Sequence, residues 1–147
     1  MTTDRKDIMQ NNNGMKCVIV IDEDLPVGLL TNTAAVLSLS LGKKISNIIG
    51  DDMIDGSNNH HSGITTTPIP ILKNNRQKLS QLRSECYENE DIFVVDFSDA
   101  AQTTKNYADY QEKLSRCRAE DLNYLGLALY GPKRTINKLT GSLPLLR

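Results

Sequence analysis

The sequence has no tryptophan, few aromatic residues (5%), only three cysteines among 147 residues, and no long hydrophobic run. Its longest apolar stretches, such as Cys17–Ile21, are far too short to cross a bilayer. Neither sign of charge dominates: 17 basic and 18 acidic residues give a net charge of −1, which argues against a protein that binds nucleic acid over its whole surface. With 39% hydrophobic residues, the chain is typical of one soluble domain with a real core and no membrane partner.

The amino-terminal residues MTTDRKDIMQNNNG are polar and lack the apolar centre of a signal peptide. We therefore expect residues 1–14 to be a flexible tail and residues 15–147 to form a single domain. The cysteines lie in apolar patterns and not in C-x-x-C pairs, which indicates buried, free thiols in a reducing compartment. These features predict a cytoplasmic protein.

Short apolar runs alternate with helical periodicities along the chain. The runs predict strands over residues 16–21, 45–50, 68–72, 91–97 and 123–131. Prolines restrict the 68–72 strand to a sheet edge, because proline cannot donate to a ladder. The polar stretch 51–67 reads as a loop. Alternation of strands and helices predicts the α/β class, with helices on both faces of the sheet.

Four helices are predicted between and after these strands. The first spans 32–41, with Thr31 or Asn32 as its cap and Gly42 as its end. The second is capped by Asn74 or Asn75 and buries Leu79, Leu82 and Cys86. The third covers 98–118, starts at Ser98 and buries Tyr107, Tyr110, Leu114 and Cys117. The fourth has Pro132 in its first turn and ends at Gly141.

Polar residues at predicted strand ends are the first candidate site. Asp24, Thr31 and Asn32 lie where the first strand meets its helix, the place where open α/β proteins bind ligands. They could equally hydrogen-bond to the backbone within a turn. Asp96 also ends a strand and either contacts a substrate or caps the next helix. Neither G-x-G-x-x-G nor the P-loop pattern occurs, so no nucleotide cofactor is predicted.

The two histidines and the basic carboxyl-terminal segment are further candidates. His60 and His61 sit in an acidic loop without H-x-x-x-H spacing, so we predict exposed histidines and no metal site, although one could act as a general base. Lys133 and Arg134 follow the last strand at a helix start, where they either contact phosphate or form a solvated face. The apolar ending GSLPLLR either packs within the chain or docks on a neighbour.

Four stretches carry a resemblance to a known family: KCVIVIDEDLPVGLLTNTAAVLSLSLG, PIPIL, VVDF and YGPKRTINKLTGSLPLLR. From residue 16 to 147 the chain resembles an uncharacterised bacterial family that is grouped, by its fold, with the type II peptidyl-tRNA hydrolases. The resemblance implies a three-layer α/β/α domain around a small mixed sheet of four to five strands.

The resemblance also implies an active site that lacks some of the hydrolase residues. The hydrolases have a lysine and a glutamine where this chain has Asn32 and Val36. Their aspartate at a strand end matches Asp96, and a threonine in the strand before Gly-Pro is replaced by Gly126. Loss of a charge-stabilising group typically costs about 3–4 kcal/mol of transition-state stabilisation.

Three hypotheses remain open. The first is a binding or regulatory domain for a small ligand or RNA, with Asp24, Thr31, His60, Lys133 and Arg134 as binding residues. The alternative is an ester hydrolase acting on peptidyl-tRNA or a related acyl substrate, with Asn32, Asp96 and His61 as catalytic residues. The third is a homo-oligomer, such as a dimer.

Overall fold

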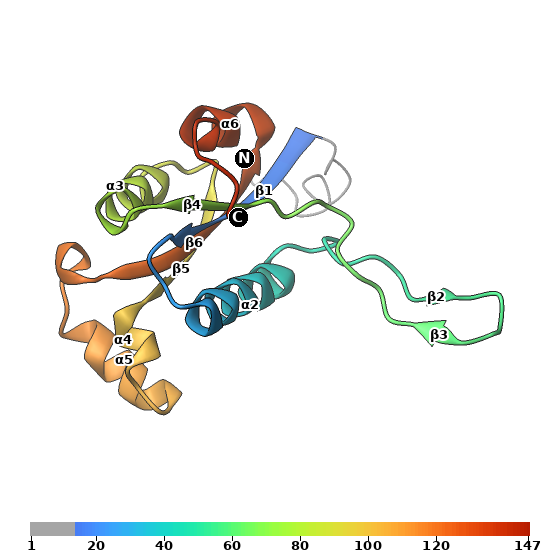
Figure 1. Ribbon diagram of the computed structural model, residues 1–147, viewed down its shortest axis with the longest axis horizontal. Coiled ribbons are helices and arrows are strands. Elements are labelled where there is room, and N and C mark those ends of the chain that lie inside the picture. Colours follow the sequence, from blue (N-terminus) through green and yellow to red (C-terminus); the bar gives the residue numbers. More distant parts are fainter. Residues whose placement is uncertain (1–13) are drawn as a thin grey trace, which may run out of the picture.

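The computed structural model describes residues 14–147, so the predicted tail lies, apart from Gly14, outside the described residues. The described chain contains a four-stranded sheet in the order β4-β1-β6-β5 (Figure 1). Its strands are β1 (Met15–Asp22), β4 (Ile71–Asn74), β5 (Phe93–Ser98) and β6 (Tyr124–Pro132). β4 is parallel to β1, and β6 is antiparallel to both β1 and β5, so β1, β4 and β5 share one direction. The predicted mixed sheet in an α/β protein is confirmed.

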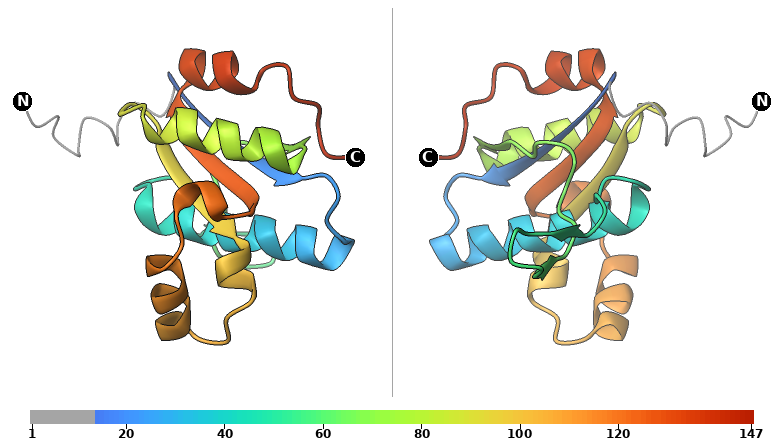
Figure 2. Two further views of the ribbon diagram at one scale, coloured as in Figure 1. Left: turned by 90° about the vertical axis from the view of Figure 1, so that its left-hand side faces the viewer. Right: turned by 90° about the vertical axis from the view of Figure 1, so that its right-hand side faces the viewer.

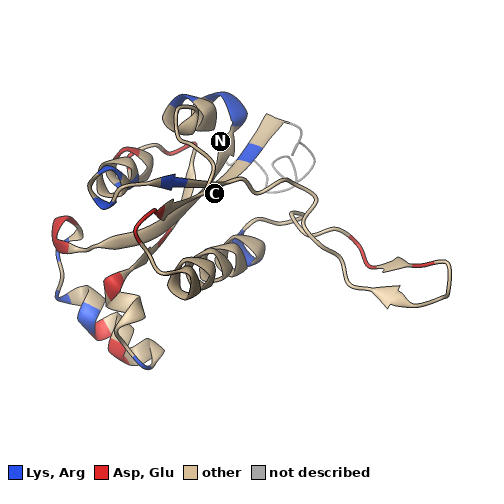
Figure 3. Cartoon of the chain, in the orientation of Figure 1, with Lys and Arg blue, Asp and Glu red and all other residues tan. Residues whose placement is uncertain are grey.

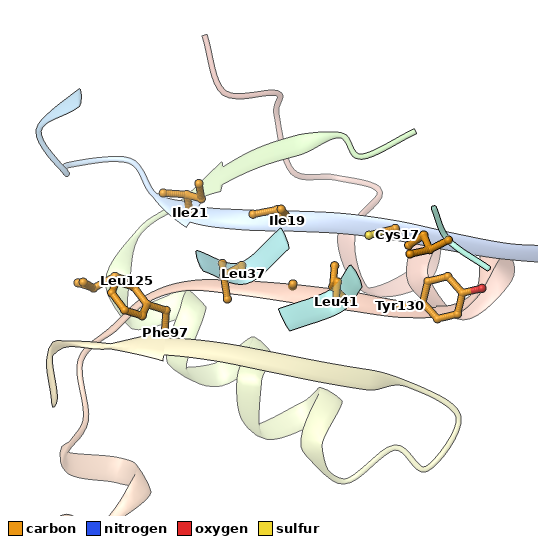
Figure 4. Close-up of a cluster of buried hydrophobic side chains, with 10 residues drawn as sticks. Cys17, Ile19, Ile21, Leu37, Leu41, Phe97, Leu125 and Tyr130 are labelled. Atoms are coloured by element: carbon orange, nitrogen blue, oxygen red, sulfur yellow. The ribbon is translucent and has the colours of Figure 1, made fainter. Parts of the chain in front are cut away.

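Helices cover both faces of the sheet (Figure 2). α2 (Val27–Lys44) covers one face, where Leu37 and Leu41 pack against the side chains of Cys17, Ile19 and Ile21 (Figure 4). α3 (Arg76–Tyr87) and α6 (Lys133–Thr140) cover the other face, and their buried residues pack against the alternate side chains of β1. β1 is therefore buried on both faces, as its continuous β-branched run predicts.

The first helix differs most from its predicted bounds. α2 begins at Val27 and continues past Gly42 to Lys44, so Thr31 and Asn32 lie inside it and cap nothing. The physical reason is Pro26, whose fixed φ suits the position before a helix. The Thr31 hydroxyl donates to the Val27 and Gly28 carbonyls instead of accepting a backbone N–H.

The next segments also depart from expectation. Residues 45–50 do not form a strand, because Asn47 adopts a φ of 64° and only Ile49 makes a ladder bridge, to Thr65. Residues 51–67 are not a plain loop. They carry the hairpin of β2 (Met53–Ile54) and β3 (His60–His61), which projects from the body (Figure 1).

The predicted helix over 98–118 is divided in two. α4 (Asp99–Gln102) ends after one turn, and α5 (Tyr107–Ser115) starts anew because the Asn106 side chain accepts from the Asp109 N–H. A 3-10 turn, η2 (Ala119–Asp121), then leads to β6. Tyr107 is exposed, contrary to prediction, whereas Tyr110, Leu114 and Cys117 pack around buried Tyr124.

Other predictions hold. The side chain of Asn75 accepts from the Lys78 N–H and caps α3, whose buried residues are Leu79, Leu82 and Cys86. The edge strand predicted over 68–72 is β4 at Ile71–Asn74, so Pro68 and Pro70 lie before the strand and not within it. Cys17 and Cys86 are buried free thiols, and burial raises the pKa of each to about 11. Among residues 14–147, no helix is both long and apolar enough to span a membrane.

The carboxyl-terminal tail packs within the chain. The Lys73 N–H donates to the Pro144 carbonyl at 3.0 Å, and the Leu146 N–H donates to the Ile71 carbonyl at 2.8 Å. The tail thus supplies hydrogen-bond partners along the outer side of β4, which would otherwise be an open sheet edge.

Gly126 of β6 permits the close approach of α2, which gives a test of the packing. A Cβ at this position would lie 2.7 Å from Thr33 Cγ2 and 3.0 Å from Leu37 Cδ1, and both neighbours are fully buried. We expect Gly126→Ala to lower the free energy of unfolding by about 1–3 kcal/mol through overpacking. Gly42→Ala, which meets nothing within 4 Å, is the matched control and should not destabilise. Equal urea midpoints for the two variants would contradict this.

Candidate functional site

Polar side chains gather at the edge of the sheet where β1, β4 and β5 end. Because these strands are parallel to one another, their carboxyl ends meet at the same edge. Asp22 ends β1 and Asp96 lies near the end of β5. Each forms an ion pair with an arginine of α3, so both carboxylates lie on the face that α3 covers.

Asp22 is the more deeply buried carboxylate, with a side chain that is 1% exposed. Its Oδ1 accepts from the Asp24 N–H at 3.0 Å, and its Oδ2 lies 3.2 Å from Arg76 Nε. These partners replace part of the hydration that burial removes. Asp24 contributes its backbone here and keeps its side chain exposed.

Asp96 is the more accessible carboxylate, at 26% exposure. Its Oδ2 lies 3.4 Å from Arg83 Nε. The guanidinium of Arg83 lies 4.4 Å from the ring centroid of Tyr87 and 5.5 Å from that of Tyr124. Arg83 therefore makes cation–π contacts with both rings in addition to its ion pair with Asp96. Asp96 therefore pairs with α3 and does not cap the following helix.

Further tyrosines complete this group. Tyr107 and Tyr110 of α5 stack edge to face, with ring centroids 5.7 Å apart. Burial raises the pKa of Tyr110, and the negative charge of Asp96 raises it further. Burial likewise raises the pKa of Tyr124, while Arg83 lowers it and Asp96 raises it. We call Asp96, Arg83, Tyr87, Tyr107, Tyr110 and Tyr124 the tyrosine cluster.

Ser98 is the remaining polar group beside the cluster. It is 1% exposed and pairs with Tyr124 in the ladder, at a register shift between β5 and β6. Its Oγ has no hydrogen-bond partner among the described residues, so Ser98 stands at the start of α4 without capping it. Asp99 instead ties this corner to β6 through the backbone and side-chain nitrogens of Asn123.

The predicted catalytic residues are not brought to one place. Asn32 is exposed on α2, which covers the sheet face opposite to that of Asp96, and Thr31 and Val36 lie on the same helix. His60 and His61 lie on the projecting hairpin. His61 Nε2 lies 2.7 Å from Asp55 Oδ2, and this bond is the main cause of the lowered pKa of Asp55.

The basic candidates lie at the other edge of the sheet. Lys133 and Arg134 are exposed in the first turn of α6, which starts where β6 ends. Pro132 at that end pairs with Met15 at the start of β1, so α6 begins at the edge opposite to the carboxyl ends (Figure 3). Among the described residues, no three His, Cys, Asp or Glu side chains are grouped to hold a metal ion.

Sequence reasoning missed the two arginines and the role of the tyrosines. Arg76 and Arg83 are seven residues apart, which places them on one side of a helix that also carries Leu79. The shared helix side of the two arginines could have been predicted from this spacing. The carboxylates with which they pair could not, because those lie on other elements.

Fold and site together define a mixed α/β domain with a carboxylate, arginine and tyrosine cluster at the carboxyl edge of its sheet. Residues 15–147 match the family described as "Protein of unknown function (DUF2000)", and the chain belongs to this family. The solved structure of Protein of Unknown Function Atu0240 from Agrobacterium tumefaciens strain C58 is similar, with a TM-score of 0.82 and 21% identity over 90% of this chain and 97% of that one. No curated protein sequence matches significantly.

These comparisons confirm the expected membership of an uncharacterised family. At 21% identity the structural likeness shows the fold alone. Neither finding names a hydrolase, so the relation to type II peptidyl-tRNA hydrolases stays a prediction.

The electrostatic coupling within the tyrosine cluster can be measured. Asp96→Asn removes a negative charge that disfavours the phenolates, so we expect the pKa values of Tyr110 and Tyr124 to fall. Titration of carbon-13-labelled tyrosine rings by NMR resolves each residue. The pKa of Tyr130 is raised by burial and by Cys17, so it is the internal control and should stay unchanged. An equal shift at all three rings, or none, would contradict the geometry.

Proposed function

We propose that this protein is an RNA-end-binding domain, in which the tyrosine cluster holds the terminal nucleoside. The observation that carries the proposal is the gathering of four of the five tyrosines around the Asp96–Arg83 pair. A nucleoside offers a flat base and a ribose with two hydroxyl groups, and the cluster has a complementary group for each.

The exposed rings supply the surface for the base. Tyr87 and Tyr107 are 70% and 79% exposed, although both are large aromatic side chains. Proteins that bind unpaired RNA stack bases on such rings, at about 1–3 kcal/mol per base. Stacking tolerates any base, which suits recognition of an end more than of a sequence.

The carboxylate supplies the contact for the ribose. Ionised Asp96 is a pure acceptor, and the 2′ and 3′ hydroxyls of a terminal ribose are donors. A contact to the 2′-hydroxyl distinguishes RNA from DNA. Arg83 positions Asp96 and offsets its charge, which reduces repulsion of the neighbouring phosphate.

We also propose that the domain shares the fold of type II peptidyl-tRNA hydrolases. Helices on both faces of a small mixed sheet support this, as does an aspartate at the end of β5. Asn32 and Val36 in place of the hydrolase lysine and glutamine favour binding over cleavage. Lys133 and Arg134 remain predicted phosphate contacts, and the cytoplasmic location also remains a prediction.

RNA binding gives the direct test. A fluorescein-labelled single-stranded RNA ending in CCA should bind, as measured by fluorescence anisotropy, and the matching DNA should bind more weakly. Tyr87→Ala should weaken RNA binding about fivefold or more through lost stacking. Asp96→Asn should reduce the preference for RNA over DNA, because it replaces a charged acceptor with a neutral amide.

Asp91→Asn is the matched control for Asp96→Asn, because Asp91 is an exposed acid that precedes β5, whereas Asp96 lies near the carboxyl end of that strand. It should leave both affinities unchanged. Equal affinity of the wild type for RNA and DNA, or binding that neither cluster variant weakens, would overturn the proposal.

The second candidate function is ester hydrolysis of peptidyl-tRNA or a related acyl compound. Asp96 favours it, because a partly exposed carboxylate at a strand end could act as a general base on water. Against it stands the position of Asn32 on α2, which covers the sheet face opposite to that of Asp96.

The two functions are separated by incubation with N-acetyl-aminoacyl-tRNA. We expect no release of the acyl group above a buffer blank, even at high protein concentration, because uncharged Asn32 stands where the hydrolases have a charge-stabilising lysine. Release that Asp96→Asn abolishes would establish the hydrolase instead. Release that survives Asp96→Asn would point to a contaminating enzyme.

A further inference from the structure

The outer face of α2 is unusual for a helix in contact with solvent. Residues 27–42 contain no charged side chain. Solvent-facing helices normally carry charged residues on their outer side. Here the outer side carries Val36 and Leu39, and Leu39 is 80% exposed. A shallow groove runs beside it, lined by Ser38, Leu39, Ser40, Gly42, Lys43 and Ile49.

The projecting arm, residues 51–64, is a second region with exposed apolar side chains. Met53, Ile54 and Ile64 are all exposed on it. Figure 1 shows the arm leaving the body near the carboxyl-terminal end of α2 and reaching outward with no other segment beside its tip. A lone two-stranded hairpin is at best marginally stable in water, so exposed apolar residues on one call for a partner.

The arm is nevertheless built in a definite shape. At its tip, Asp55 accepts from the backbone N–H groups of Ser57 and Asn59, and Asn58 takes the positive φ that the turn needs. At its base the two limbs cross so closely that a Cβ on Gly63 would lie 1.8 Å from the Gly50 carbonyl oxygen. Such preorganisation lowers the entropy cost of docking.

The charges of the two surfaces are complementary. Residues 45–72 contain no lysine or arginine, and the arm carries Asp51, Asp52 and Asp55. Lys43 lines the groove on α2, and Lys43 and Lys44 are exposed in the last turn of that helix (Figure 3). The acidic, apolar arm therefore matches the apolar groove with its basic end.

We propose that two copies of this chain form a two-fold dimer in which the arm of each copy packs on the α2 groove of the other. Both complementary surfaces belong to the same chain, and Ile49 lies between them at the arm's base. A two-fold axis passing near Ile49 brings both arms onto both grooves at once, as an isologous interface requires. This inference stands independently of the RNA-binding proposal.

Other occupants fit these surfaces less well. Nucleic acid and anionic membranes would be repelled by the three aspartates of the arm. A different protein would have to be complementary to both the acidic, apolar arm and the groove with its basic end, and these two surfaces are already complementary to each other.

The oligomeric state of the full chain tests the dimer. Sedimentation equilibrium over a concentration series should show the wild type at twice the chain mass. Leu39→Glu in the groove and Ile54→Asp on the arm should each weaken the dimer about tenfold or more. Val27→Glu is the matched control, because Val27 is exposed on the same helix about 18 Å from Leu39 and should have no effect.

A charge exchange tests the proposed polar contact. Lys43→Glu and Asp51→Lys should each weaken association, and the double variant should recover it, because opposite charges again face each other across the interface. Failure of the double variant to recover affinity would exclude this pairing of arm and groove.

Cross-linking distinguishes an arm on α2 from a simple α2–α2 dimer. The Leu39→Cys chain carries a purification tag, so that its band on a gel differs in mass from that of the untagged Ile54→Cys chain. The two chains are mixed and treated with a short bis-maleimide. The expected product is the mixed band that joins the two chains. A wild type that stays monomeric at its highest soluble concentration, or a product that joins only Leu39→Cys chains to each other, would overturn the proposal.

Discussion

The burial of β1 on both faces and along both edges is the constraint on which the rest of the structure depends. The backbone groups of this buried strand need partners: β6 pairs with Met15 to Ile21 on one side, and β4 pairs with Ile19 to Asp22 on the other. Its alternate side chains need two separate apolar layers, one under α2 and one under α3 and α6. Gly126 opposite Ile21 leaves the space into which α2 settles. Even the carboxyl-terminal tail serves this arrangement, because it covers the far side of β4.

The same constraint explains where the polar chemistry lies. Strand alternation places Asp22 and Asp96 on the face of α3, at the end of the apolar layer on that face. A carboxylate in such a place is tolerable only with a partner, and α3 supplies one arginine to each. The helix that completes the core thereby also sets the charge balance of the candidate site. The tyrosines gather beside Asp96 because α5 packs on Tyr124 at the start of β6.

The fold was more readable from the sequence than the site. The strand cores, the Asn75 cap and the buried face of α3 follow from local patterns, which act over a few residues. The start of α2 was misplaced because two polar residues, Thr31 and Asn32, resemble a cap more than Pro26 does. Residues 45–50 read as a strand because apolar content alone does not reveal the left-handed Asn47. The break in the predicted 98–118 helix was missed because the apolar residues keep helical spacing across it. The signal for the break is Asn106, which caps a new helix.

By itself, the sequence determined the class of fold, the central strand and the free buried thiols. Each of these depends on residue type and on near neighbours. Only the tertiary structure decided which charges meet: Asp22 pairs with Arg76 across 54 residues of chain, and Asp96 pairs with an arginine from the preceding helix. It also decided that α2, which carries Asn32, and Asp96 lie on opposite faces of the sheet, and that the arm extends away from the body. Such pairings depend on how whole elements pack, because long-range geometry leaves no periodic mark in the sequence.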